Sequence, residues 1–196
     1  MVTTPTGTRE RLRAHALALF LERGYDETSV EDVAAAAGVS HMTFYRHFGA
    51  KEGVLLEDPY DDVIAAAVLA QDAALPTLEQ VRLGFLAAWG ALPEPADEET
   101  RARVRIIAGH AGLRARAWES NRRTADLVTA ALVSRGTSDL EARVTTGACL
   151  GALMEALLAW GAAQDGRPFG PLVREALTLL APPARERPAP TGRSAG

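Results

Sequence analysis

Six closely spaced side chains can donate hydrogen bonds or make apolar contacts with a nucleic acid: His41, Met42, Thr43, Tyr45, Arg46 and His47. Imidazole, hydroxyl and guanidinium groups bind phosphate oxygens and base edges, and an apolar side chain can contact a thymine methyl group. No acidic residue lies between Asp32 and Glu52, so the segment presents only neutral or positive groups to a phosphate backbone. This part of the chain therefore favours recognition of a nucleic acid.

Three helices and a tight turn are expected to position these side chains. The first helix should run from Arg9 to Arg23 and end at Gly24. The expected capping and turn residues are Thr28 with Glu31 or Ser29 with Asp32 for the second helix, Gly38 and Val39 for the turn, and Ser40 for a third helix over residues 41–48. Residues 29–48 thus fit the helix-turn-helix plan, in which the second helix of the motif enters the DNA major groove.

Two interpretations of this segment remain open from the pattern alone. A helix-turn-helix shape also occurs in proteins that never contact DNA, and the run from Phe44 to Phe48 can be a packing seam. The net charge of −4 gives no support from overall electrostatics, because nucleic-acid-binding domains are usually basic. The case for DNA therefore depends on how charge is distributed locally.

A family resemblance favours DNA binding. The sequence TSVEDVAAAAGVS at residues 28–40, followed by TFYRHF at residues 43–48 and by Lys51-Glu52, resembles the N-terminal signature of TetR-family transcriptional regulators nearly position by position. The resemblance covers about the first quarter of the chain. It implies an all-α fold in which a helix-turn-helix domain is followed by a helical bundle that dimerises and takes up a small-molecule effector.

The resemblance also implies a role for each residue of the motif. Residues matching His41, Met42, Thr43 and Tyr45 lie over base edges, and residues matching Thr28, Ser29, His47 and Lys51 hold phosphates. Ser40 and Arg46 complete the expected DNA-binding set, although Arg46 can face solvent instead. Met42 departs from a frequent glycine, and Ala50 from a frequent serine cap before Lys51.

The rest of the chain is predicted to be helical. No run of alternating residues indicates a strand, and helix starts at Thr77 with Gln80, at Asp97 and at Ser138 with Glu141, together with Pro171 in a last helix, bring the expected total to about nine helices. The expected domains are residues 5–65 and 66–181, followed by a disordered tail at 182–196. A kink at Pro59 is expected to transmit changes to the DNA-binding domain.

An apolar effector is expected to bind inside the bundle. Candidate contacts are Phe85, Trp89, His110, Arg114, Arg116, Trp118, Asn121 and Met154, with Trp160 as a further wall. Aromatic residues at helical spacing are also the ordinary content of a core, and arginine bands are often solvated faces. The stretch from Arg101 to Arg116 resembles the effector domain of acyl-CoA-responsive members, where cations near an apolar pocket would hold phosphates.

A row of small residues predicts a close helix contact. Ala148, Gly151, Ala152 and Ala156 lie along one long helix, and such a row lets another helix approach within the chain or across a dimer. In the resembling family the last two long helices pair with those of a second copy, so the homodimer is preferred. The expected partners are palindromic double-stranded DNA, a small hydrophobic effector and a second copy, with no membrane.

Composition and missing motifs bear on the other classes of protein. No segment approaches about 18 uncharged apolar residues and no signal peptide is expected, so a cytoplasmic location is predicted. Cys149 is the single cysteine, and the four histidines are scattered, so neither a cofactor nor a metal is expected. A helical-bundle carrier or enzyme is the rival class, although no GxSxG, HExxH or phosphate-binding glycine loop occurs.

Overall fold

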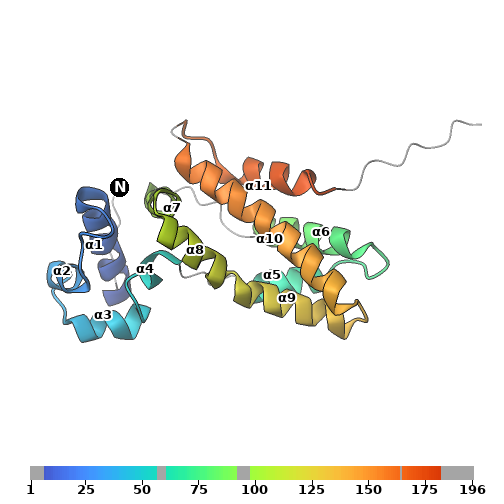
Figure 1. The fold of residues 1–196 in the computed structure, drawn as a ribbon, viewed down its shortest axis with the longest axis horizontal. Helices are drawn as coiled ribbons and strands as arrows, with labels where there is room; N and C mark the ends of the chain where they lie inside the picture. Colours follow the sequence, from blue (N-terminus) through green and yellow to red (C-terminus); the bar gives the residue numbers. More distant parts are fainter. Residues whose placement is uncertain (1–6, 57–60, 92–97, 164, 182–196) are drawn as a thin grey trace, which may run out of the picture.

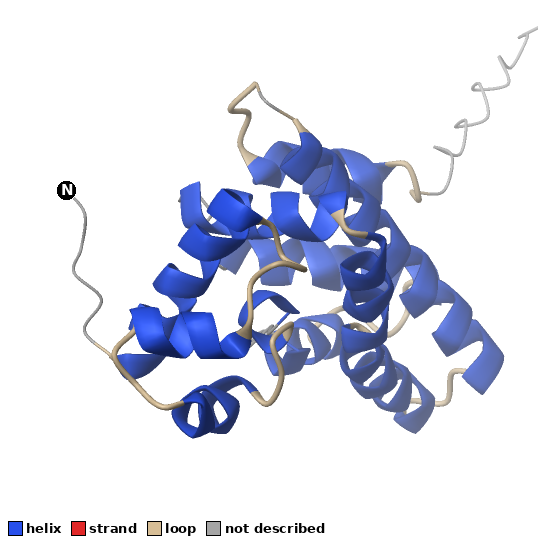
Figure 2. Cartoon of the chain, turned by 60° about the vertical axis from the view of Figure 1, so that its left-hand side comes forward, coloured by secondary structure: helices blue, strands red, loops and turns tan. Residues whose placement is uncertain are grey.

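The computed structural model describes residues 7–56, 61–91, 98–163 and 165–181. Within these ranges the protein is all-α, as predicted, and Figure 2 shows helices joined by loops with no strand. The helices are α1 (Thr8–Arg23), α2 (Val30–Ala36), α3 (His41–Phe48), α4 (Gly53–Leu56), α5 (Asp61–Leu69), α6 (Thr77–Ala91), α7 (Glu98–Gly109), α8 (Ala111–Ser120), α9 (Arg122–Ser134), α10 (Asp139–Ala162) and α11 (Phe169–Thr178). The described residues therefore form eleven helices rather than about nine. The predicted kink at Pro59, the helix start at Asp97 and the tail at 182–196 lie outside them.

Serine caps begin the helices where the sequence predicted them. The Ser138 hydroxyl accepts the backbone N–H of Glu141 at the start of α10, and Ser29 and Ser40 cap α2 and α3 in the same way. Of the two capping boxes that the sequence allowed for α2, the structure forms the one between Ser29 and Asp32. A cap satisfies backbone donors that the first turn of a helix leaves without partners.

The N-terminal unit consists of α1 to α4, residues 7–56, and lies at one end of the molecule in Figure 1. Gly38 in the α2–α3 turn has φ 69°, a backbone conformation that L side chains rarely adopt, which explains the glycine there. The apolar residues of this unit form a first core that continues into α7, α8 and α10, consisting of Leu12, Ala16, Leu17, Phe20, Val30, Val33, Ala37, Phe44, Phe48, Val54, Leu55, Ile107, Leu113, Ala117 and Met154. The N-terminal unit is therefore packed against the rest of the chain.

The C-terminal unit, α5 to α11, is arranged around α10, which contacts α6, α7, α9 and α11 (Figure 1). Its second core comprises Val68, Val81, Phe85, Val104, Val128, Leu132, Ala142, Cys149, Leu150, Ala156, Trp160, Phe169, Val173 and Leu177. Close approaches depend on glycine: a Cβ on Gly84 would lie 2.5 Å from the Cα of Val68, so α5 and α6 touch backbone to backbone there.

α10 is long and apolar enough, by length and composition, to cross a membrane, with a mean hydropathy of 1.3 over its 18-residue window. The expectation that no segment approaches this composition is wrong, because the charges of α10 are concentrated at its start and Val144 to Ala162 contains only Glu155. Of that window, 44% is buried, and four other helices pack against α10. Its apolar composition matches its place at the centre of the C-terminal unit.

Candidate nucleic-acid interface

α3 presents a polar surface at its N-terminal end. The Ser40 hydroxyl accepts the backbone N–H of Thr43 at 3.2 Å and lies 3.0 Å from the Thr43 hydroxyl, so both side chains are held at the start of the helix. Met42 is 66% exposed and Tyr45 42% exposed, while Phe44 faces the core. Together with the exposed His41 and Arg46, these side chains form the outward face that the sequence predicted.

The other face of α3 is held by aromatic packing and by one arginine. Phe44 is fully buried and Phe48 nearly so, with ring centroids 5.3 Å apart. The Arg9 guanidinium of α1 donates to the backbone carbonyl of His47 at 2.9 Å and lies 4.9 Å above the Phe48 ring. A cation at the C-terminal end of a helix stabilises its free carbonyl groups. α3 is therefore fixed at both ends.

Ser29 and Thr28 differ in what they can offer to DNA. Ser29 is exposed, and its hydrogen bonds to Asp32 lower the pKa of that carboxyl below its usual value. Thr28 is 1% exposed, and its hydroxyl donates to the carbonyl of Gly24 at 2.8 Å. The predicted phosphate contact by the Thr28 side chain does not fit this geometry, because the hydroxyl closes the α1–α2 loop instead.

The Lys51 ammonium makes hydrogen bonds within the protein. It donates to the carbonyls of Tyr25 at 2.7 Å and Thr28 at 2.9 Å, and lies 4.1 Å from the centroid of the Tyr25 ring. Burial, with a smaller contribution from Glu52, raises the pKa of Tyr25 to about 12, so its ring stays neutral beneath the cation. Two of the three ammonium donors are therefore used within the protein, and the phosphate contact that the family resemblance implies would depend on the third.

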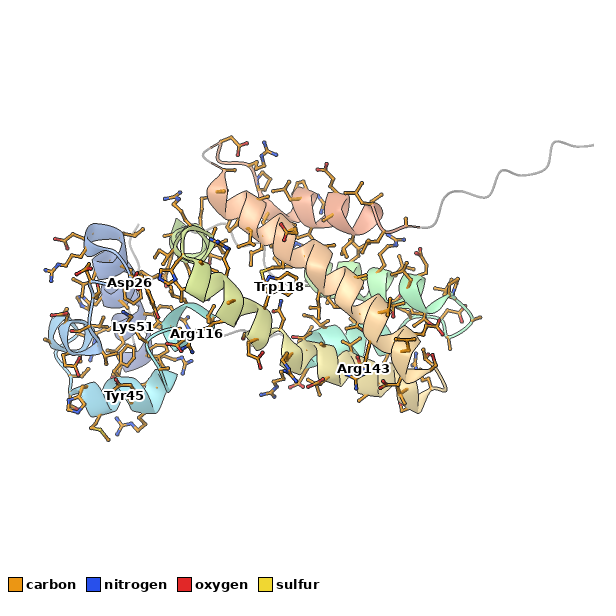
Figure 3. All side chains as sticks on the ribbon, in the orientation of Figure 1. Asp26, Tyr45, Lys51, Arg116, Trp118 and Arg143 are labelled. Atoms are coloured by element: carbon orange, nitrogen blue, oxygen red, sulfur yellow. The ribbon has the colours of Figure 1, made fainter. Side chains whose placement is uncertain are left out.

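The residues predicted to bind an effector are not gathered at one place. Phe85 belongs to the second core and Met154 to the first. Trp89 packs edge-on against Phe169 with ring centroids 4.8 Å apart, and Asn121 lies where α8 meets α9. Trp118, which Figure 3 labels on α8, is 43% exposed, and its ring lies near Gly151 of α10.

The predicted phosphate-holding arginines have partners within the protein. Arg114 donates to the carbonyl of Ala108 at 2.6 Å, and Arg116 pairs with Glu52 of the N-terminal unit. Arg101 donates to the carbonyl of Arg167 at 2.6 Å. A ligand phosphate would have to compete with these contacts.

Two acidic partners in the N-terminal unit were missed by sequence reasoning. Asp26 forms a hydrogen bond with His110, and Glu52 forms one with Arg116. Figure 3 labels Asp26, Lys51 and Arg116, which lie on the side where α8 meets the N-terminal unit. The paired residues are 84 and 64 positions apart in the chain, and no local pattern connects them.

Comparison with known families identifies the chain. The profile described as "Bacterial regulatory proteins, tetR family" matches residues 12–57, and the profile "MftR C-terminal domain" matches residues 75–185, more than half of the chain. The chain belongs to the TetR family. The resemblance inferred from the first quarter of the sequence is thus confirmed.

Relatives agree with this assignment over part of their length. The chain is 39% identical over 85 residues to the HTH-type transcriptional regulator TcmR of Streptomyces glaucescens, covering 42% of this chain and 38% of TcmR. It is 34% identical over 93 residues to the HTH-type transcriptional repressor DhaR of Mycobacterium sp. (strain GP1), covering 44% of this chain and 45% of DhaR. The matches therefore span less than half the length of these curated relatives.

Solved structures share the fold along most of the chain. FadR of Bacillus halodurans, a fatty acid degradation regulator, has a TM-score of 0.57 at 20% identity and covers 94% of this chain and all of that one. Thermus thermophilus FadR, a TetR-family repressor solved in complex with lauroyl-CoA, has a TM-score of 0.51 at 28% identity with the same coverage.

In this TetR-family chain the row of small residues on α10 lies largely within the subunit. Ala156 is 6% exposed in the second core, and a Cβ on Gly151 would lie 3.8 Å from the Trp118 ring. Ala148 and Ala152 are half-buried. The most exposed apolar side chains of α10 are instead Leu140 and Val144, one turn apart at its start. The predicted row is therefore less exposed than the start of α10, where these two side chains lie.

The described residues provide no group of three or more His, Cys, Asp or Glu side chains that could hold a metal. Cys149 is fully buried, and desolvation raises the pKa of its thiol to about 12. Its position in the second core is that of an apolar packing residue.

Proposed function

We propose that this TetR-family protein is a sequence-specific DNA-binding transcriptional regulator without catalytic activity. The observation that carries the proposal is α3, whose capped N-terminal end exposes His41, Met42 and Tyr45 while its other face is buried. The major groove is about 12 Å wide and admits an α-helix, and side chains near the N-terminus of a recognition helix reach the base edges. DNA binding through residues 41–47 follows.

The names of the relatives support repression as the mode of action. DhaR is described as a transcriptional repressor and TcmR as a transcriptional regulator. The protein acts as a homodimer that presents two copies of α3 one DNA turn apart, about 34 to 36 Å, to a palindromic operator. Because its family is described as bacterial regulatory proteins, it acts in the cytoplasm, where bacterial DNA lies. Residues 5–65 form the DNA-binding domain, and residues 66–181 form the effector and dimerisation domain.

The proposed effector is a long-chain acyl-CoA or another hydrophobic ligand. The supporting observation is the T. thermophilus FadR complex with lauroyl-CoA, a relative at 28% identity over 94% of this chain. A phosphorylated head group would bind arginines of α8, and Arg116, whose side chain is 64% exposed, is the most accessible cation there. Binding to Arg116 would compete with Glu52, which belongs to the N-terminal unit.

The test compares two DNA duplexes. The purified protein is titrated by fluorescence anisotropy with the DNA upstream of its own gene and with a scrambled duplex of equal composition, each at several salt concentrations. Specific binding should exceed non-specific binding by about 10³-fold or more and should weaken as salt rises. A carrier or enzyme without DNA binding should show neither effect, and equal binding to both duplexes would exclude this DNA as an operator.

A further inference from the structure

A single imidazole joins α8 to the N-terminal unit. His110 precedes α8, and its Nδ1 accepts the backbone N–H of Leu113 at 3.1 Å, so Nδ1 carries no proton. Its Nε2 lies 3.1 Å from both carboxylate oxygens of Asp26 in the α1–α2 loop, so Nε2 carries the proton and donates it. The ring also stands edge-on against Tyr25 with centroids 5.3 Å apart.

The same helix makes further contacts with the N-terminal unit. Arg116 pairs with Glu52, and the Ser120 hydroxyl donates to the carbonyl of Leu56 at 3.2 Å. Leu113 and Ala117 belong to the first core, which α1 to α4 build. Positions 110, 113, 117 and 120 follow helical spacing, so these residues lie on one face of α8.

Histidine fits this junction for a chemical reason. Neutral imidazole has an acceptor nitrogen and a donor N–H on opposite sides of one rigid ring, so it can cap a helix and hold a carboxylate at the same time. Asparagine or aspartate can cap α8, but their shorter side chains do not extend to Asp26. The N-terminus of α8 therefore cannot move away from the α1–α2 loop without losing one of the two hydrogen bonds.

We propose that His110 is a positioning residue that holds the N-terminal unit at a fixed angle to the C-terminal unit through Asp26. The consequence for DNA rests on the proposed function. A ligand that displaces α8 would break this link, and the angle between the two units, which sets how α3 is presented to DNA, would no longer be fixed. The hydrogen bond itself, and the angle that it fixes, do not depend on what the protein binds.

The angle can be measured without DNA or effector. Spin labels at Glu31→Cys on α2 and Asp126→Cys on α9, both exposed sites, report the distance between the two units by pulsed electron paramagnetic resonance. Labelled chains are diluted with unlabelled ones so that only distances within one chain contribute. The parent chain should take up no label, because Cys149 is fully buried.

Three variants distinguish the hydrogen bond between His110 and Asp26 from the hydrogen bond by which His110 caps α8. His110→Asn keeps a capping acceptor but loses Asp26, and Asp26→Ala leaves the cap intact. Both should broaden the distance distribution while the melting temperature hardly changes, because Asp26 is exposed and exposed ion pairs contribute little to stability. The double variant Asp26→Arg/His110→Asp, which restores a cap and a reversed pair, should narrow the distribution again.

Glu27→Ala is the matched control, because Glu27 is an exposed acidic neighbour of Asp26 in the same loop. Its distribution should equal that of the parent. A parent-like distribution in both His110→Asn and Asp26→Ala would overturn the proposal, as would a double variant no narrower than the single ones. If the parent chain does not bind DNA, that result would contradict the proposed function but not the role of His110, because the distance measurement does not involve DNA.

Discussion

The hydroxyl of Thr43 lies 3.0 Å from that of Ser40, which also accepts the Thr43 backbone N–H. The Thr43 side chain is therefore held in one orientation in the free protein, at the end of α3 that is proposed to contact bases. Its neighbour Met42 is more exposed but carries no strong donor. Thr43 is therefore the residue at the start of α3 that we expect to read a base edge.

Thr43→Ala should lower affinity for the operator by about 1 to 3 kcal/mol and leave affinity for random DNA almost unchanged, because a base contact carries sequence information. The measurement is anisotropy titration with both DNAs at one salt concentration. Thr178→Ala is the control, since it removes a hydroxyl that bonds to the carbonyl of Arg174 on α11. Equal losses on operator and random DNA would contradict base readout by Thr43.

Residues that act on neighbours in the sequence could be predicted, and residues that act at a distance could not. The caps at Ser29, Ser40 and Ser138 follow from spacing, because hydroxyl and backbone donor are three residues apart. Thr28 and Lys51 match the family signature, so their importance could be predicted. Their hydrogen bonds to backbone carbonyls could not, because these bonds depend on how the α1–α2 loop closes. That closure is a tertiary property, which spacing does not encode.

At the scale of elements, the contact between α5 and α6 depends on one missing side chain. Gly84 is buried, and a Cβ there would lie 2.5 Å from the Cα and 2.8 Å from the backbone nitrogen of Val68. Backbone atoms cannot rotate away as a side chain can, so one of the two helices would have to shift.

Gly84→Ala should lower the free energy of unfolding by about 1 to 3 kcal/mol, the usual cost of overpacking, even though alanine favours the helix. Gly90→Ala on the same helix is the matched control, because a Cβ there meets nothing within 4 Å. It should leave stability equal or raise it by up to about 1 kcal/mol. Urea unfolding followed by circular dichroism measures both, and similar values for the two variants would disprove the close packing at Gly84.

The bounds of α1, α2 and α3 could be predicted within a residue or so, because caps and glycine turns mark them. The region after residue 98 was harder. α7, α8 and α9 follow one another with single-residue junctions at His110 and Asn121. Gly109 and Gly112 lie beside the first junction, but no glycine or proline lies beside the second. At the first junction the His110 ring caps α8 and also contacts Asp26, a partner far away in the sequence that no local pattern indicates.

At the scale of the whole molecule, the first core crosses from the N-terminal unit into α7, α8 and α10, so the two units are joined by apolar contacts as well as by polar ones. The second core occupies the C-terminal unit, and Leu140 and Val144 of α10 stay outside both. An exposed apolar pair on the helix that we propose for association is the reason to test that end of α10 for the dimer.

Val144→Arg should weaken self-association, because each subunit would bury an added charge against its partner. Val144 is 60% exposed, so the substitution should leave the fold intact. Leu21→Arg, at a 53% exposed apolar site on α1, is the matched control. Sedimentation velocity at several concentrations gives the oligomeric state. A variant that associates as tightly as the parent would place the interface elsewhere on the surface.

A long-chain acyl-CoA should quench tryptophan fluorescence and release operator DNA, provided that it binds the state with low DNA affinity more tightly, since equal affinity for both states shifts nothing. The phosphates of the acyl-CoA would compete with Glu52 for the Arg116 guanidinium. Loss of the ion pair would weaken one of the contacts that hold α8 to the N-terminal unit. Arg116→Ala should therefore reduce quenching and release together.

Arg143→Ala is the control for this response, because Arg143 is an exposed arginine paired with Asp139 on α10, away from the N-terminal unit (Figure 3). It should respond to acyl-CoA as the parent does. Titrations with a free fatty acid and with a planar hydrophobic drug distinguish the other hydrophobic ligands, because neither carries the phosphates that Arg116 would bind. If micromolar acyl-CoA causes neither quenching nor release, acyl-CoA is not the effector, whereas DNA binding by α3 is unaffected by that result.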